Sequence, residues 1–358
     1  MTPPKSILDT IDTPAVLVDL DIARRNIERF QAYADAHGMK VRPHIKTHKL
    51  PAVAAMQLAA GAIGITCQKV SEAEAMVAGG GDISDVLITY NILGAEKLDH
   101  LRKLARKVTL AVVADNLTVV NGLSAAFAQE AAPLRVLVEC NTGADRCGAG
   151  TPEAAADLAR KIVAAPGLAF GGLMTYPPVD GAAAVQDFMT RTKALLAAAG
   201  IDVPVVSSGG SPSMMTAADA PVATEYRPGT YVYNDRSLVA RGACDWEDCA
   251  LTVLATVVSV PAPNRAIIDA GSKTLTSDLL GLSGHGHVLG RPDITIDQLS
   301  EEHGRLIANG PIKLAVGDNV RIVPNHACVV TNMVDAVHVL EHGALVGLWP
   351  VVARGKIT

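Results

Sequence analysis

The densest titratable chemistry of the sequence lies at 41–49, VRPHIKTHK, where His44, Lys46, His48 and Lys49 fall within six positions. A lysine amine attacks an aldehyde when neighbouring groups enclose it and lower its pKa. The alternative for a lone lysine is a solvated surface residue, but the flanking histidines favour chemistry. We therefore predict Lys46 as a Schiff-base nucleophile and keep His48 as a second catalytic candidate.

A second group of reactive residues lies at 324–330, PNHACVV, where His326 and Cys328 are two positions apart. If this segment is a strand, both side chains point to one face. Imidazole and thiolate suit a zinc-type ion, and two protein ligands leave positions open for substrate, as in a catalytic site. The alternative is a hydrogen-bonded histidine beside a buried thiol.

The remaining five cysteines form no CxxC pair and are predicted to be reduced, buried thiols. Another motif with period two is SGHGH at 283–287, which contains Gly284-His285-Gly286-His287. Because glycines fix metal ligands poorly, we favour a mobile loop over a site here and leave a second metal site as the alternative.

Two glycine-rich turns are typical of phosphate binding. They are SSGGSPS at 207–213 and YRPGTYVYND at 226–235, and such turns expose successive backbone N–H groups. A third loop, ECNTGADRCG at 139–148, carries Arg146, a permanent cation that is compatible with binding a ring nitrogen or a carboxylate. The alternative for Arg146 is a surface ion pair.

The elements that must position these residues are short β-branched runs separated by Ala-rich amphipathic stretches. Eight such units over about 200 residues favour a (β/α)8 TIM-like barrel, and no GxGxxG follows the first run. The predicted strands are 41–47, 64–69, 85–90, 109–115, 135–140, 172–176, 204–210 and 223–233. In a barrel the active site lies at the carboxyl ends of the strands, where Lys46, Gln68 and Tyr176 fall.

After about residue 240 the pattern changes to strands separated by Gly, Pro and Asn, which indicates a C-terminal antiparallel β domain. The alternating segment TPAVLVDLD at 13–21 is predicted to join that domain. We thus predict a barrel over 22–240 and a β domain over 241–358 together with 13–21.

Composition narrows the partners and the location. The formal net charge is −5 and no Lys/Arg run occurs, so nucleic acid is not an expected partner. There is no stretch of 18 apolar residues and no signal-peptide pattern, so we expect no membrane span and a cytoplasmic protein.

These motifs together resemble the D-threonine aldolase / D-serine dehydratase family, the metal-dependent branch of the alanine-racemase-like pyridoxal phosphate enzymes. The resemblance rests on RPHIKTHK (42–49), CQKVSEA (67–73), GADRCG (143–148), SSGG (207–210), RPGTYVY (227–233) and PNHAC (324–328). It implies a barrel with a β domain, a homodimer, a small D-amino acid as substrate, and pyridoxal 5'-phosphate with a divalent metal (Zn, Mn or Mg) as cofactors.

The resemblance also implies residue roles. Lys46 carries the cofactor, Arg146 faces its pyridine nitrogen, and His326 and Cys328 hold the metal. Tyr176 is a further catalytic and cofactor-binding candidate. The other predicted cofactor residues are Gln68, Ser208, Gly209, Gly210, Gly229, Thr230 and Tyr231.

Two reactions compete within that family. Its aldolases resemble one another in a His-x-Asp metal pair and a histidine soon after the sixth strand's tyrosine, whereas this chain has His326-x-Cys328 and Tyr176-Pro177-Pro178. We therefore predict a dehydratase that eliminates hydroxide from D-serine, D-threonine or 3-hydroxyaspartate to give a 2-keto acid and ammonia. Retro-aldol cleavage to glycine and an aldehyde is the alternative. A racemase leaves the His/Cys pair unexplained, and the β domain disfavours a non-catalytic carrier.

Overall fold

The computed structural model describes residues 7–358, which divide into two compact units. The barrel unit consists of residues 28–46, 51–229 and 356–358. The sheet unit consists of residues 47–50 and 230–355 together with the described residues before 28. Neither unit is one continuous stretch of chain.

Eight parallel strands form the barrel unit, as the alternating pattern predicts. They are β2 (Lys40–Val41), β3 (Ile65–Cys67), β4 (Asp85–Ile88), β5 (Thr109–Ala114), β6 (Leu134–Cys140), β7 (Leu168–Thr175), β8 (Val206–Ser208) and β9 (Glu225–Tyr226). Their order is β2-β9-β8-β7-β6-β5-β4-β3, and a parallel bridge between His44 and Thr66 connects the two end strands. The TIM-like barrel is therefore confirmed.

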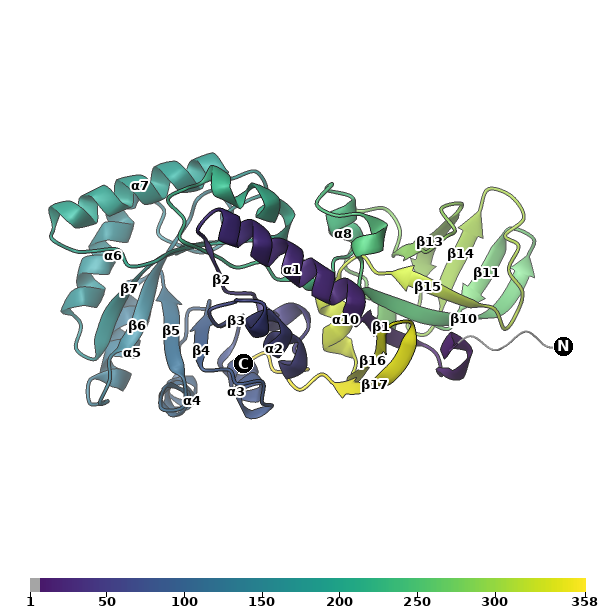
Figure 1. Ribbon diagram of the computed structural model, residues 1–358, viewed down its shortest axis with the longest axis horizontal. Coiled ribbons are helices and arrows are strands. Elements are labelled where there is room, and N and C mark those ends of the chain that lie inside the picture. The colour runs from purple at the N-terminus through teal and green to yellow at the C-terminus, as the bar shows by residue number, and fades with distance from the viewer. Residues whose placement is uncertain (1–6) are drawn as a thin grey trace. The chain divides into compact units, whose positions relative to one another are not determined.

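Helices follow the strands around the barrel, and Figure 1 shows α4 to α7 on the outer side of β4 to β7. The helices are α1 (Leu20–Ala36), α2 (Pro51–Ala59), α3 (Val70–Ala78), α4 (Ala95–Ala105), α5 (Leu117–Phe127), α6 (Pro152–Ala164) and α7 (Ala182–Ala198), with 3-10 turns η2 (Ile45–Thr47) and η3 (Ser211–Asp219). The start of α6 shows why a helix begins where it does. The Thr151 side chain accepts from the Ala154 N–H, and Pro152 occupies the first turn.

Two of the predicted barrel strands are much shorter than expected. The strand predicted over 41–47 ends at Val41, and the one predicted over 223–233 ends at Tyr226. Each is followed by an Arg-Pro pair and then a 3-10 turn, Ile45–Thr47 in one case and η4 (Thr230–Val232) in the other. Proline has no N–H to donate to a ladder, so the regular strand stops there.

The sheet unit is built on a nine-stranded, mainly antiparallel sheet. Its strands are β1 (Ala15–Asp19), β10 (Leu251–Ala262), β11 (Arg265–Ile268), β12 (His287–Val288), β13 (Ile294–Leu299), β14 (Gly304–Ala308), β15 (Asn319–Val323), β16 (Ala336–Glu341) and β17 (Ala344–Pro350). Strand β1 lies between β10, with which it pairs antiparallel, and β16, with which it pairs parallel. The long strand β10 also pairs with β11 and β15 (Figure 1).

Short helical pieces connect the strands of the sheet unit. They are η1 (Ile7–Thr10), α8 (Arg236–Val239), η5 (Trp246–Asp248), α9 (Ser272–Leu275) and α10 (Ala327–Met333). Among the helices of residues 7–358, none is long and apolar enough to cross a membrane.

A buried ionic network lies inside the barrel. Arg42, whose side chain is 8% exposed, donates from Nε to Glu225 Oε2 at 2.9 Å and from Nη1 to Asp85 Oδ1 at 2.6 Å. Glu225 also accepts from the Ser207 hydroxyl. Gly64 makes room for the network, because a Cβ there would lie 2.5 Å from Arg42 Nη1.

The network predicts that Arg42→Met destabilises the protein by about 3–5 kcal/mol, because it removes the cation that donates directly to the buried carboxylate of Glu225. Urea unfolding followed by circular dichroism measures this. The control is Arg135→Met, since Arg135 lies 3.4 Å from the same Asp85 but is 42% exposed, and its loss is expected to cost under about 1 kcal/mol. Equal costs for the two variants would contradict this account of the network.

Candidate active site

Lys46 lies in η2, directly after the first barrel strand, and is half-buried. The His44 ring fixes the backbone there, since its Nδ1 accepts from the Lys46 N–H at 3.4 Å and its Nε2 lies 3.1 Å from Gln68 Oε1. Gln68 is held in turn, because its Nε2 donates to Thr89 O at 3.0 Å. The structure thus brings Lys46 and Gln68 together through His44.

The glycine turn after β8 lies against the turn after β9. A Cβ on Gly209 would lie 2.7 Å from Arg227 O, and Gly210 has φ of 149°, so side chains are excluded from this turn. The Tyr226 hydroxyl donates to Gly210 O at 2.9 Å, and the Gly229 N–H donates to Ser211 Oγ at 3.1 Å. Glycine turns of this kind are typical of phosphate binding, and the phosphate-binding role of Ser208, Gly209, Gly210 and Gly229 stays a prediction.

Arg146 and Tyr176 are exposed residues of the loops after β6 and β7. The Arg146 guanidinium lies over the Tyr176 ring, with 4.7 Å from Cζ to the ring centroid. The loop that carries Arg146 is tied down by Asp115, whose Oδ2 accepts from Gly148 N–H at 2.9 Å. Both predicted residues are therefore neighbours in the barrel unit.

Arg227 is a residue that the sequence reasoning missed, although it lies in the quoted RPGTYVY motif. Its guanidinium is buried and donates to Ser207 Oγ at 2.6 Å, Ser208 O at 3.2 Å and Thr175 O at 2.8 Å, which joins the ends of β7, β8 and β9. Burial lowers its pKa to about 10, against the opposing effect of Glu225. The signal in the sequence was an arginine followed by a proline at the end of a predicted strand, which also occurs at Arg42-Pro43.

Three predicted residues belong to the sheet unit instead. Thr230 Oγ1 lies 3.6 Å from Cys328 Sγ, and Tyr231 is buried at 1% exposure. His48 is fully buried, accepts from Leu50 N–H at its Nδ1 (3.1 Å) and packs edge-on to Tyr233. Through these contacts the imidazole of His48 holds the turn that follows Lys46. A catalytic role for His48 stays a prediction.

His326 and Cys328 do not lie in a strand, so the predicted strand geometry is wrong. Strand β15 ends at Val323, and α10 starts at Ala327 with His326 as its extended N-cap residue (φ −140°, ψ 100°). Asp235 forms this helix start, because its buried carboxylate accepts from Ala327 N–H at 3.0 Å while it caps α8 by accepting from Leu238 N–H at 3.2 Å. One carboxylate thus begins two helices.

The two side chains nevertheless form a donor set that fits a divalent metal. Cys328 Sγ lies 3.1 Å from Thr47 Oγ1, and His326 Nδ1 lies 2.6 Å from Asp278 Oδ2. Burial lowers the pKa of His326, but Cys328 and the Asp278 carboxylate outweigh it and raise this pKa to about 9. A histidine and a thiol that lie beside each other are ligands typical of zinc and related ions.

The SGHGH motif lies next to the segment that precedes α10. His287 begins β12 and stacks on Trp246 with 3.8 Å between ring centroids. The loop before it is held by Arg236, which donates to Ser283 O at 2.8 Å, and by Asn325, whose Nδ2 donates to Gly284 O at 2.8 Å. The motif is therefore bonded to the segment that precedes His326, and the mobility we expected of it stays a prediction.

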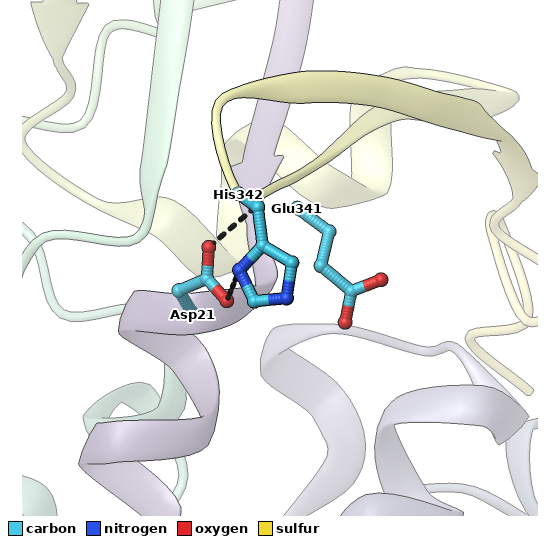
Figure 2. Close-up of side chains that lie close together, drawn as sticks. All are labelled: Asp21, Glu341 and His342. Atoms are coloured by element: carbon cyan, nitrogen blue, oxygen red, sulfur yellow. Dashed lines mark hydrogen bonds and ion pairs between the residues drawn. The ribbon is translucent and has the colours of Figure 1, made fainter.

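A second cluster of metal-ligating side chains lies on the sheet unit. Within residues 7–358, the ligand atoms of Asp21, Glu341 and His342 lie within 4.8 Å of one another, and Figure 2 shows His342 turned toward Asp21. Arg24 already supplies a cation there, at 2.9 Å from Glu341 and 3.7 Å from Asp21. We therefore interpret the cluster as an ion-pair network that ties the β16–β17 hairpin to the first turn of α1.

A lysine and phosphate-type glycine turns at the ends of parallel barrel strands, with a separate sheet, define a pyridoxal phosphate enzyme of the alanine racemase fold. Residues 18–237 match the alanine racemase N-terminal domain, and residues 250–340 match a putative serine dehydratase domain. The first match alone spans more than half of the chain.

Relatives that match nearly the whole chain include both kinds of lyase. D-threonine aldolase from Arthrobacter sp is 35% identical, covering 98% of this chain and 95% of the relative. D-threo-3-hydroxyaspartate dehydratase from Delftia sp. is 33% identical, covering 95% and 97%. The crystal structure of D-threonine aldolase from Filomicrobium marinum superposes with a TM-score of 0.90 at 34% identity, covering 98% of each chain.

The chain therefore belongs to the alanine-racemase-like family that contains the D-threonine aldolases and the D-threo-3-hydroxyaspartate dehydratases, and it is a pyridoxal-phosphate-dependent lyase. For D-threo-3-hydroxyaspartate dehydratase, alanine variants of a histidine and of a cysteine two positions later have been solved, the cysteine variant in a metal-free form. This spacing is the same as that of His326 and Cys328.

The turn after β8 predicts a test of cofactor binding. Gly209→Ala places a Cβ against the Arg227 backbone. We expect this overpacking to cost about 1–3 kcal/mol of the binding free energy, so that pyridoxal phosphate binds roughly 5- to 150-fold more weakly. Fluorescence titration of apoprotein measures the dissociation constant. Gly150→Ala is the control, since a Cβ at Gly150 meets nothing within 4 Å. Unchanged affinity in Gly209→Ala would argue against the phosphate turn.

Proposed function

We propose that this enzyme eliminates hydroxide from a D-β-hydroxy-α-amino acid, most simply D-serine, D-threonine or D-threo-3-hydroxyaspartate, to give a 2-keto acid and ammonia. The observation that carries the proposal is the imidazole–thiol pair at the start of α10. The same pair of residue types, at the same spacing, is the one replaced in the solved variants of D-threo-3-hydroxyaspartate dehydratase.

The barrel residues fit pyridoxal phosphate, whose ring withdraws electrons from the substrate Cα when bound. In the proposal Lys46 carries the cofactor and then takes the α-proton at Nζ. Ser208, Gly209, Gly210 and Gly229 bind the phosphate, with Thr230 and Tyr231 following in the chain. Gln68, Arg146 and Tyr176 complete the predicted cofactor site. Arg146 is a permanent cation and cannot hand a proton to the pyridine nitrogen.

His326 and Cys328 are proposed to hold a divalent ion, with zinc the ion best suited to this pair and manganese and magnesium as alternatives. A metal here supplies a Lewis acid for the β-hydroxyl, which eases departure of hydroxide. Two protein ligands leave positions for substrate, so the role is catalytic rather than structural.

The loop after β7 favours elimination over aldol cleavage. Retro-aldol cleavage needs a group that removes the proton of the β-hydroxyl. The sequence contains no histidine between Tyr176 and His285. One hydrogen bond holds the loop, in which the Asp180 N–H donates to Ser213 Oγ at 3.1 Å. The loop therefore provides no imidazole for that proton.

Aldol cleavage to glycine and an aldehyde is the second candidate. The favouring observation is the likeness to D-threonine aldolases, at 35% identity in the Arthrobacter enzyme and a TM-score of 0.90 in the Filomicrobium structure. A cytoplasmic location and a homodimer stay predictions from the sequence.

The cofactor assignment predicts that Lys46→Ala loses both turnover and the visible absorption of the bound cofactor after dialysis, because the covalent attachment is gone. The control is Lys69→Ala, which removes a second lysine of the barrel unit and should retain both signals. The Lys69 ammonium lies 3.6 Å from the centroid of the Tyr90 ring. Retention of both signals in Lys46→Ala would overturn the assignment.

Product analysis separates the two reactions. Enzyme is incubated with D-serine, D-threonine and D-threo-3-hydroxyaspartate, and keto acid, ammonia, glycine and aldehyde are quantified together. We expect keto acid and ammonia in equal amounts, and loss of turnover on chelation with the cofactor absorption and circular dichroism retained. Glycine plus aldehyde as the main products would establish the second candidate. Unfolding of the protein on chelation would make the metal structural.

A further inference from the structure

The side chain that orients the proposed metal ligand His326 is Asp278, which neither motif matching nor spacing singles out. We propose that Asp278 is a positioning residue that fixes the ring of His326 with Nε2 presented to the metal. The inference rests on the proposed metal site, and the experiment below separates the two.

The contact is direct and short. Asp278 Oδ2 lies 2.6 Å from His326 Nδ1. A carboxylate at Nδ1 accepts a hydrogen bond from that N–H, so the lone pair of the neutral ring is at Nε2 and the ring is held in one orientation. Metal-bound histidines usually donate their second nitrogen to such a group, which also makes the ligand nitrogen more basic.

Asp278 is itself placed by the end of α9. Thr276 has φ of 64°, a left-handed conformation that turns the chain, and its Oγ1 accepts from the Asp278 N–H at 3.2 Å. The side chain of Asp278 is 36% exposed and that of His326 is 25% exposed. The carboxylate therefore reaches His326 from a turn built for it rather than from a regular helix or strand.

The other carboxylate near His326 is not available for this role. Asp235 is fully buried, and its oxygens accept from Ser237 Oγ at 2.7 Å, Leu238 N–H at 3.2 Å and Ala327 N–H at 3.0 Å. Asp235 holds the backbone beside His326, and Asp278 holds the ring. The two carboxylates thus fix different degrees of freedom of the same ligand.

The geometry also argues against Asp278 as a third metal ligand. In the described part of the chain, a carboxylate oxygen of Asp278, the sulfur of Cys328 and one nitrogen of His326 do not all lie within 4.8 Å of one another. Asp278 occupies Nδ1, so in the proposal Nε2 would be the nitrogen that holds the metal together with Cys328. Its effect on the metal therefore passes through the imidazole.

The test is the affinity of the cofactor-loaded enzyme for Zn²⁺ and Co²⁺, measured by competition with a chelator, with the cobalt absorption spectrum recorded for each variant. Asp278→Ala is expected to weaken binding by about 100-fold and Asp278→Asn by about 10-fold, because the amide oxygen still accepts from Nδ1–H but carries no charge. The thiolate-to-cobalt band should persist in both variants at saturating metal, since the ligand set is unchanged. Asp293→Asn, a change in an exposed carboxylate paired with Arg291, is the control and should leave affinity unaltered.

The outcomes are distinct. Unchanged metal affinity in Asp278→Ala overturns the positioning role if His326→Ala abolishes binding. Loss of the cobalt spectrum in Asp278→Asn also overturns it, because it makes Asp278 a ligand. Normal metal affinity in His326→Ala removes the metal site itself, and with it both proposals. A fall in melting temperature without a fall in affinity assigns Asp278 to folding alone.

Discussion

The buried carboxylate of Asp235 is the constraint on which the proposed metal site depends. It joins the first turn of α8 to the first turn of α10, through Leu238 and Ala327. A buried carboxylate is tolerated when hydrogen-bond donors surround it, and here most of the donors are backbone N–H groups of helix starts. Because His326 and Cys328 flank Ala327, their backbone is placed by an interaction in which neither side chain takes part.

The barrel unit follows a related design at its own functional end. Arg42-Pro43 and Arg227-Pro228 close two neighbouring strands, and each arginine points its charge into buried polar groups. Proline ends the ladder, and the arginine holds the strand ends that the ladder no longer holds. Most of the residues predicted to act on the cofactor therefore lie in irregular backbone just after the strand ends, although Ser208 is the last residue of β8.

The barrel and the antiparallel sheet could be predicted from the sequence because they depend on patterns that repeat along the chain. The strand predicted at His326 and Cys328 was wrong. The β-branched pair Val329-Val330 suggests a strand there, whereas the helix start is held by Asp235, which is distant in sequence. Asp278 and Arg227 were missed for the same reason. Their roles arise from contacts with residues 48 and 20 or more positions away, as with His326 and Ser207.

The place of β1 bears on how the chain folds during synthesis. Each barrel strand from β3 to β9 pairs with the one before or after it in sequence, so much of the barrel unit can assemble as it emerges from the ribosome. Strand β1 is made first, yet its partners are Leu251–Leu254 of β10 and His338–Leu340 of β16. This apolar strand therefore stays unpaired while more than 200 further residues are translated, because Ala15 pairs with Leu254. Such long-range pairing slows folding, and until it forms β1 stays open to pairing with other chains.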